Sequence, residues 1–264
     1  MILVPINNLV VKYMRITTGS SSIWADIWKG HLLQFDKLER SPMSNDTGKR
    51  ILLGFFVLAF VARPLFKIGS QYLYLSDSDW KQLVQVIFLL ASAALITRLY
   101  CRLSFDAIGL NHWRVWTRRE KLYFFQVVPL ACAVFGVLLF PEVQLFIQKT
   151  NPMHLVMTIL IPALLWGFFQ EFVYRGLLQT ELIRRFGVVL GVGASNLLFT
   201  FGPLHFYHFG NSNNPQYLWI FVAIFSIGLL FSLIYHRTGN LWIVGIMHGI
   251  GDLFMDGLGR AASN

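Results

Sequence analysis

"LLWGFFQEFVYRGLLQTEL", residues 164–182, is hydrophobic enough to cross a membrane, yet it holds Gln170, Glu171 and Arg175 near its centre. Inserting a charged side chain at the centre of a membrane helix costs about 2.5–3.5 kcal/mol. Glu171 and Arg175 are four residues apart with the acid first, which is the favourable order for an ion pair on a helix. We therefore predict a membrane helix with an internal ion pair, and its polar groups mark a candidate functional site.

The composition excludes an ordinary soluble protein. Hydrophobic residues make up 55% of the 264 residues and charged residues 13%, and the mean hydropathy is +0.56, whereas soluble domains carry about 25% charged residues. A net charge of +9 is compatible with a nucleic-acid-binding protein. However, the basic residues lie between hydrophobic runs, as in cytoplasmic loops of membrane proteins. We expect a lipid bilayer and no nucleic acid as partner. Cys101 and Cys132 are predicted to be packing residues.

Hydrophobic runs separated by charges predict an all-α, polytopic membrane protein of about seven transmembrane helices. The predicted spans are 51–66, 83–97, 122–140, one that starts near 155, two within 186–236, and 241–258. Residues 205–217 separate the two spans of the charge-free stretch 186–236. Residues 104–121, which are basic and contain Trp, are expected to form an interfacial helix or loop.

The basic residues also predict how the chain crosses the membrane. If the N-terminus is cytoplasmic, the inner segments hold 16 of the 22 Lys and Arg, the outer segments hold five, and Arg175 lies within the membrane. Because basic residues gather on the cytoplasmic side, we predict a cytoplasmic N-terminus. No apolar run of signal-peptide length occurs in residues 1–50. We predict a polar, disordered extension at 1–42, or a true start at Met43, followed by a membrane domain at 43–264. The expected location is a bacterial inner membrane.

Two predicted turns bring further ionisable residues to similar depth. Glu171 and His205 lie 16 and 18 residues from a turn at Gly187, or about 24 and 27 Å along ideal helices, so they face each other in a helical hairpin. His248 and Asp252 lie 9 and 13 residues after a second turn near Gly239, or about 14 and 20 Å along an ideal helix, and are one helical turn apart on the last span. Two imidazoles and two carboxylates can thus meet in one polar pocket.

Such a pocket suits hydrolysis, because a carboxylate or an imidazole can take a proton from water and an imidazole or protonated acid can donate to an oxyanion. Other chemistries have less support, since the sequence contains no HExxH and no GxSxG motif. Ser195 and Ser226 are expected to bond to their own helix backbone. We predict no cofactor, with zinc at His205 and His208 as a lesser alternative.

Three short motifs resemble those of the CAAX protease and bacteriocin-processing family, also called the Abi family. "QEFVYRG" (170–176), "FGPLH" (201–205) and "HGIGD" (248–252) are similar to its EExxxR, FxxxH and HxxxN or HxxxD motifs, in that order. The resemblance covers about residues 151–258. It implies a four-helix catalytic core and a glutamate-type intramembrane endopeptidase.

The resemblance also implies a role for each polar group. A glutamate of the first motif and His205 would activate a water, His248 and Asp252 would stabilise the oxyanion, and Arg175 would hold the first motif in place. The implied substrate is a peptide or protein that is exported, membrane-anchored or lipidated.

The chain departs from the family pattern where the base is expected. The paired glutamates of the family are here Gln170 and Glu171, and a carboxamide cannot take a proton from water. Three explanations are open: Glu171 is the base, the chain is a catalytically impaired homologue acting as an immunity, binding or scaffold protein, or Gln170 is an engineered replacement. Asp252, where Asn is commoner, is a milder departure, because a protonated Asp can serve. We predict the endopeptidase first and the impaired homologue second.

Overall fold

The structure, a computed structural model, describes residues 45–72, 80–138, 140, 144, 152–205 and 217–254. These residues form helices and loops and contain no strand, which confirms the all-α prediction. The predicted extension at 1–42 lies outside the described residues.

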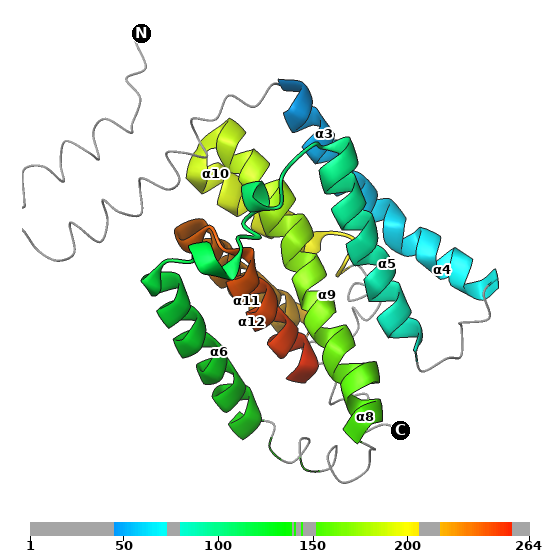
Figure 1. Ribbon diagram of the computed structural model, residues 1–264, viewed down its shortest axis with the longest axis vertical. Helices are drawn as coiled ribbons and strands as arrows, with labels where there is room; N and C mark the ends of the chain where they lie inside the picture. The colour runs from blue at the N-terminus through cyan, green and yellow to red at the C-terminus, as the bar shows by residue number, and fades with distance from the viewer. Residues whose placement is uncertain are drawn as a thin grey trace, which may run out of the picture. The chain divides into compact units, whose positions relative to one another are not determined.

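The described helices include several π-helical and 3-10 segments that continue or connect the α-helices (Figure 1). In chain order they are α3 (Asn45–Phe56), η1 (Val57–Ala62), α4 (Arg63–Tyr72), α5 (Lys81–Leu95), η2 (Ile96–Tyr100), η3 (Asp106–Ile108), η4 (Trp113–Val115), α6 (Arg118–Leu138), α8 (Pro152–Leu155), η5 (Val156–Leu160), α9 (Ile161–Glu171), η6 (Phe172–Gln179), α10 (Thr180–Phe201), α11 (Tyr217–Thr238) and α12 (Leu241–Asp252).

Four helical stretches among the described residues are long and apolar enough to span a membrane. They are Asn45–Gln71, Lys81–Tyr100, Met153–Phe201 and Trp219–Thr238, while Leu241–Asp252 is a shorter apolar helix. The predicted total of seven spans is therefore not confirmed. The segment at 104–121 is a loop with the two short helices η3 and η4, followed by the start of α6.

The 49-residue stretch Met153–Phe201 is a helical hairpin rather than one rod. Gly187 adopts φ +79° and ψ 172°, a left-handed backbone that favours glycine, and breaks α10 there. Contacts between the two arms join residues at equal distance from this turn: Ile183 with Gly191, Gln179 with Ser195, and Arg175 with Phe199. The predicted turn at Gly187 is thus confirmed.

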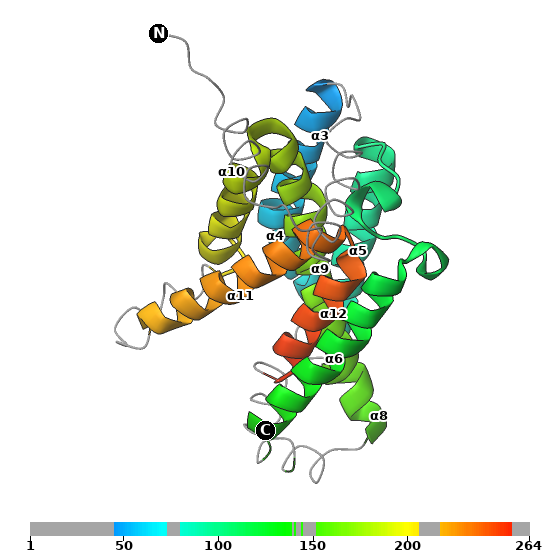
Figure 2. The same ribbon diagram turned by 90° about the vertical axis from the view of Figure 1, so that its left-hand side faces the viewer.

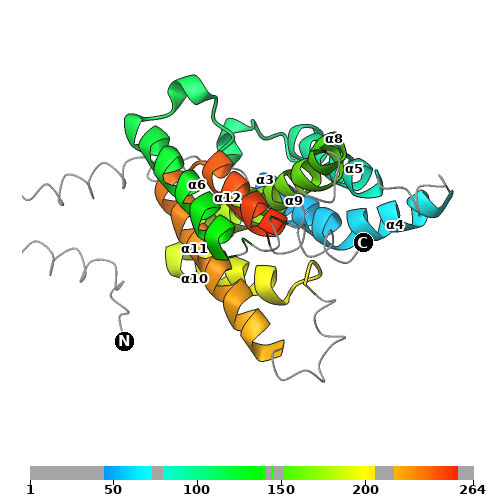
Figure 3. The ribbon, with the colours of Figure 1, turned by 90° about the horizontal axis from the view of Figure 1, so that it is seen from below.

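A second turn, at Gly239 (φ +61°), reverses the chain between α11 and α12. Two hydrogen bonds hold this turn. Leu241 N donates to Gly109 O, in the loop after η3, at 2.9 Å, and Asn240 Nδ2 donates to Glu120 Oε1, on α6, at 3.1 Å. Along its length α6 packs against α12 (Figure 3). The direction in which α12 leaves the turn is therefore set by several hydrogen bonds.

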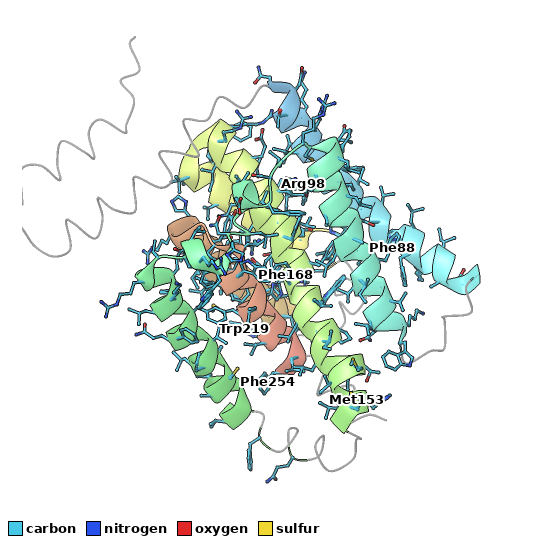
Figure 4. All side chains as sticks on the ribbon, in the orientation of Figure 1. Phe88, Arg98, Met153, Phe168, Trp219 and Phe254 are labelled. Carbon is cyan, nitrogen blue, oxygen red and sulfur yellow. The ribbon has the colours of Figure 1, made fainter. Side chains whose placement is uncertain are left out.

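α12 crosses α9 at close range, and the two lie side by side in both Figure 1 and Figure 2. Glycines make this possible: a Cβ at Gly167 would collide with the Gly249 backbone, and one at Gly249 would lie 2.5 Å from Leu164 Cα. Phe168, labelled in Figure 4, fills the space over Gly245. Small residues at helix crossings are typical of membrane proteins, where close backbone approach gives much of the packing energy.

The glycine at this crossing gives a first prediction. Gly249→Ala is expected to destabilise the protein by about 1–3 kcal/mol, because the added methyl group meets the backbone of Leu164 rather than a flexible side chain. Gly251→Ala is the matched control on the same helix, since its Cβ would meet nothing within 4 Å. Thermal unfolding in detergent measures both, and equal melting temperatures for the two variants would contradict the crossing.

The two cysteines give a second prediction. Cys101 is buried as expected, while Cys132 is exposed, so the packing prediction is wrong for Cys132. Burial raises the pKa of the Cys101 thiol to about 11. In a Cys132→Ser variant at pH 8, only about one Cys101 thiol in a thousand is then ionised, so iodoacetamide should modify it after unfolding but not before. Rapid modification of the folded protein would show that this packing is wrong.

Candidate active site

The first motif lies where α9 passes into the π-helical turns of η6. π-Helical turns are rare and occur often at functional sites. Glu171 ends α9, and Arg175 lies in η6, with Arg175 Nε 3.3 Å from Glu171 Oε2 and both side chains fully buried. The predicted ion pair is confirmed, and its complete burial means that neither charge is shared with solvent.

His248 on α12 lies between two carboxylates. Its Nδ1 is 2.7 Å from Glu171 Oε1, and its Nε2 is 3.5 Å from Asp252 Oδ1. Both ring nitrogens therefore face carboxylate oxygens, and the imidazole is held from two sides.

Gln170 closes the chain of contacts. Its Nε2 donates to Asp252 Oδ2 at 3.1 Å. One continuous polar network thus joins α9, η6 and α12. Its members, in order of contact, are Gln170, Asp252, His248, Glu171 and Arg175. The sequence predicted that the ionisable members would meet, and the structure brings them together.

His205 joins this network through an aromatic ring. The Phe199 ring lies edge-on to His205 at 4.9 Å and edge-on to His248 at 5.7 Å, centroid to centroid. His205 Nδ1 lies 2.7 Å from Phe199 O. Because a carbonyl only accepts, Nδ1 carries the hydrogen, and Nε2 is the basic nitrogen of the neutral ring.

Phe199 is a residue that the sequence interpretation missed. The motif comparison pointed to Phe201, which is 45% exposed and stacks on Phe221. Phe199 is 3% exposed, and the Arg175 guanidinium lies over its ring at 4.5 Å. Its place opposite Arg175 across the turn at Gly187 was the signal that could have identified it.

Helix α11 accepts hydrogen bonds from the network and from side chains beside it. Three side chains donate to its backbone carbonyls along one stripe: Asn196 to Phe225 O at 3.0 Å, Arg175 to Gly228 O at 2.9 Å, and Gln179 to Ser232 O at 3.0 Å. Gly228 leaves room for this approach, because a Cβ there would collide with Asn196 and the Phe199 ring. The direction of the Arg175 guanidinium is therefore fixed by α11 as well as by Glu171.

The remaining polar residues have separate explanations. Glu181 pairs with Arg184 at 2.7 Å and with Arg185, away from the network. Ser195 donates to Val192 O and Ser226 to Val222 O, as expected for helix serines. A cavity of about 590 Å³ is lined by residues of the 104–116 loop and by Trp242, and contains none of the six predicted site residues.

No group of three or more His, Cys, Asp or Glu placed to hold a metal occurs among the residues that the structure describes. His208, the second member of the suggested zinc pair, lies outside them. The zinc alternative is therefore still a prediction.

Comparison with known proteins points to one family. Residues 152–254 match the family model described as "Type II CAAX prenyl endopeptidase Rce1-like". This confirms the resemblance to the CAAX protease family, and the matched segment runs from α8 through α12 and contains all six predicted site residues. The family match and the four membrane-length helices indicate an integral membrane protein with a segment similar to a protease family. No curated protein and no solved structure matches the chain.

The buried ion pair gives a third prediction. Arg175→Met leaves the Glu171 carboxylate buried without its cation, which is expected to cost about 3–5 kcal/mol. The double variant Glu171→Gln/Arg175→Met has no uncompensated charge and should melt at a higher temperature than Arg175→Met alone. Thermal unfolding in detergent measures this, and a double variant that melts lowest of all would show that the two residues act independently.

Proposed function

We propose, taking the Rce1-like segment at 152–254 as the premise, that this protein is an intramembrane endopeptidase. The reaction is hydrolysis of a peptide bond by a water that a carboxylate and a histidine activate. The observation that supports it best is the continuous network from Gln170 through Asp252, His248 and Glu171 to Arg175, with His205 beside it.

The geometry suggests a division of roles. Glu171 and Arg175, both fully buried, orient His248 and hold the end of α9. His205, with Nε2 as its basic nitrogen, is the imidazole that receives a proton or a hydrogen bond from the water. His248 and its neighbours contribute to stabilising the oxyanion that forms when the water attacks the carbonyl carbon.

The substrate class follows from the place of the site. Residues buried among membrane-length helices suit a peptide bond that lies in or near the bilayer, in a membrane-anchored, lipidated or exported protein. The description of the matched family contains the words "CAAX prenyl endopeptidase", so a farnesylated CAAX peptide is the first probe that we choose. Glu171 lies 16 residues, or about 24 Å along an ideal helix, from the basic inner turn at Gly187, and this depth favours an exported substrate.

We propose a bacterial inner membrane with a cytoplasmic N-terminus, and catalysis without a cofactor.

A second candidate is a catalytically impaired homologue that binds a membrane or peptide partner. It is favoured by Gln170, which cannot act as a base, and by Glu171, whose two oxygens face His248 and Arg175. The two candidates differ in whether the wild-type chain cleaves anything.

Cleavage in proteoliposomes gives the fourth prediction. Wild-type protein is tested on two quenched fluorescent probes, a farnesylated CAAX peptide and a transmembrane peptide. At least one should be cleaved, and His205→Ala should lower kcat by a factor of about 10²–10⁴, the usual contribution of a general acid or base. A metal chelator should leave the rate unchanged, whereas loss of activity with chelator and its return with zinc would favour the zinc alternative.

Asp106→Asn is the control, because Asp106 lies in η3, outside the network. Activity that survives both Glu171→Ala and His205→Ala would contradict the protease proposal. Specific binding of a probe without cleavage by wild-type protein would favour the impaired homologue.

A further inference from the structure

The two carboxylates of the network differ in their availability to a substrate. Glu171 is fully buried, and its oxygens face His248 Nδ1 at 2.7 Å and Arg175 Nε at 3.3 Å. The Asp252 oxygens also face partners, His248 Nε2 at 3.5 Å and Gln170 Nε2 at 3.1 Å, but Asp252 lies at the last turn of α12 and keeps 20% of its side chain exposed. A base must reach the water that it deprotonates, and of these two groups Asp252 is the one with access.

Gln170 is oriented toward this carboxylate. A carboxylate only accepts hydrogen bonds, so the amide nitrogen of Gln170 and not its oxygen faces Asp252 Oδ2, 3.1 Å away. The amide carries a second N–H on the same nitrogen. Gln170, which is 3% exposed, therefore holds Asp252 with one hydrogen, and its second N–H is the one that we assign to a substrate oxygen.

A glutamate at position 170 would place a second carboxyl group beside Asp252. Two carboxylates at this separation repel each other and favour sharing one proton. The amide at 170 removes that repulsion and leaves the Asp252 carboxylate available as a proton acceptor. The two residues are thus a matched pair of one acid and one amide.

The same two residues are the two departures of this chain from the motifs that it resembles. The family motifs have a glutamate at the position of Gln170 and more commonly an asparagine at the position of Asp252. This chain has the amide at the first position and the acid at the second. The structure places the two side chains in contact. The departures therefore amount to one exchange, in which acid and amide have changed places across the α9–α12 crossing.

We propose that Asp252 is the general base of this protein and that Gln170 is an oxyanion donor. The inference rests on the proposed endopeptidase function. Asp252 takes one proton from water as the water oxygen bonds to the peptide carbonyl carbon, and the carbonyl oxygen becomes an oxyanion that accepts from Gln170. The C–N bond then breaks, the proton held by Asp252 passes to the leaving nitrogen, and the products are a carboxylic acid and an amine.

Exchanging the pair gives the fifth prediction. Asp252→Asn should lower kcat at least a hundredfold with KM little changed, because the base is lost while the shape is kept. The double variant Gln170→Glu/Asp252→Asn restores one acid and one amide, and should regain at least a tenth of the wild-type kcat. Asp106→Asn is the matched acid-to-amide control at an exposed position. The assay is cleavage of the farnesylated CAAX and transmembrane peptides in proteoliposomes.

A second readout does not depend on activity. Gln170→Glu places two acids together, so its melting temperature should fall at neutral pH, and the added Asp252→Asn should restore it. Melting temperatures that are additive across this cycle would contradict the paired geometry.

The outcomes separate the inference from the proposed function. Full activity in Asp252→Asn, with loss in Glu171→Gln, overturns the inference and leaves the endopeptidase in place with Glu171 as base. Cleavage by Gln170→Glu alone, with none by wild-type protein, overturns the inference and favours the impaired homologue. Cleavage by none of the variants or the wild type contradicts the proposed function, and the inference falls with it.

Discussion

The Glu171 carboxylate is fully buried, and the helices around it are placed so that its charge is paired. A charge without exposed surface must be paired, and Glu171 is paired by Arg175 on its own helix and by His248 on α12. Arg175 in turn donates to Gly228 O on α11 and lies over the Phe199 ring of α10. Through Arg175 and His248, one carboxylate thus connects α9 and η6 with α10, α11 and α12, and a shift of α12 would separate Glu171 from His248.

Glycines allow these polar contacts to form. Gly167 and Gly249 let the backbones of α9 and α12 approach, so that side chains one turn further along can meet. Gly228 does the same between α11 and the Asn196 and Phe199 side chains. Membrane helices gain little from the hydrophobic effect when they associate, so close packing and hydrogen bonds carry more of the stability. The same interactions that stabilise the core therefore fix the candidate site.

Local spacing predicted much of this from the sequence. The Glu171–Arg175 pair follows from positions four apart on a helix, and the turns at Gly187 and Gly239 follow from breaks in hydrophobic runs. The contact of Gln170 with Asp252 was not predicted, because it depends on how α9 and α12 rotate and cross. Phe199 was missed although it lies as far from Gly187 as Arg175 does. The π-helical turns after Glu171 alter that rotation and leave no clear mark in the hydropathy. Hydropathy alone could not predict the number of spans either, since α12 has 12 residues and is not of full membrane length.

In the proposed assignment the accessible carboxylate of this site belongs to Asp252, and Glu171 is a buried positioning group. The most direct test is a crystal structure, in a lipid phase, of Asp252→Asn with an uncleaved peptide bound. We expect the scissile carbonyl to lie within hydrogen-bonding distance of the Gln170 amide and beside residue 252, with Glu171 still held by His248 and Arg175. A peptide whose scissile bond lies against Glu171, with the Glu171–His248 contact broken, would contradict it.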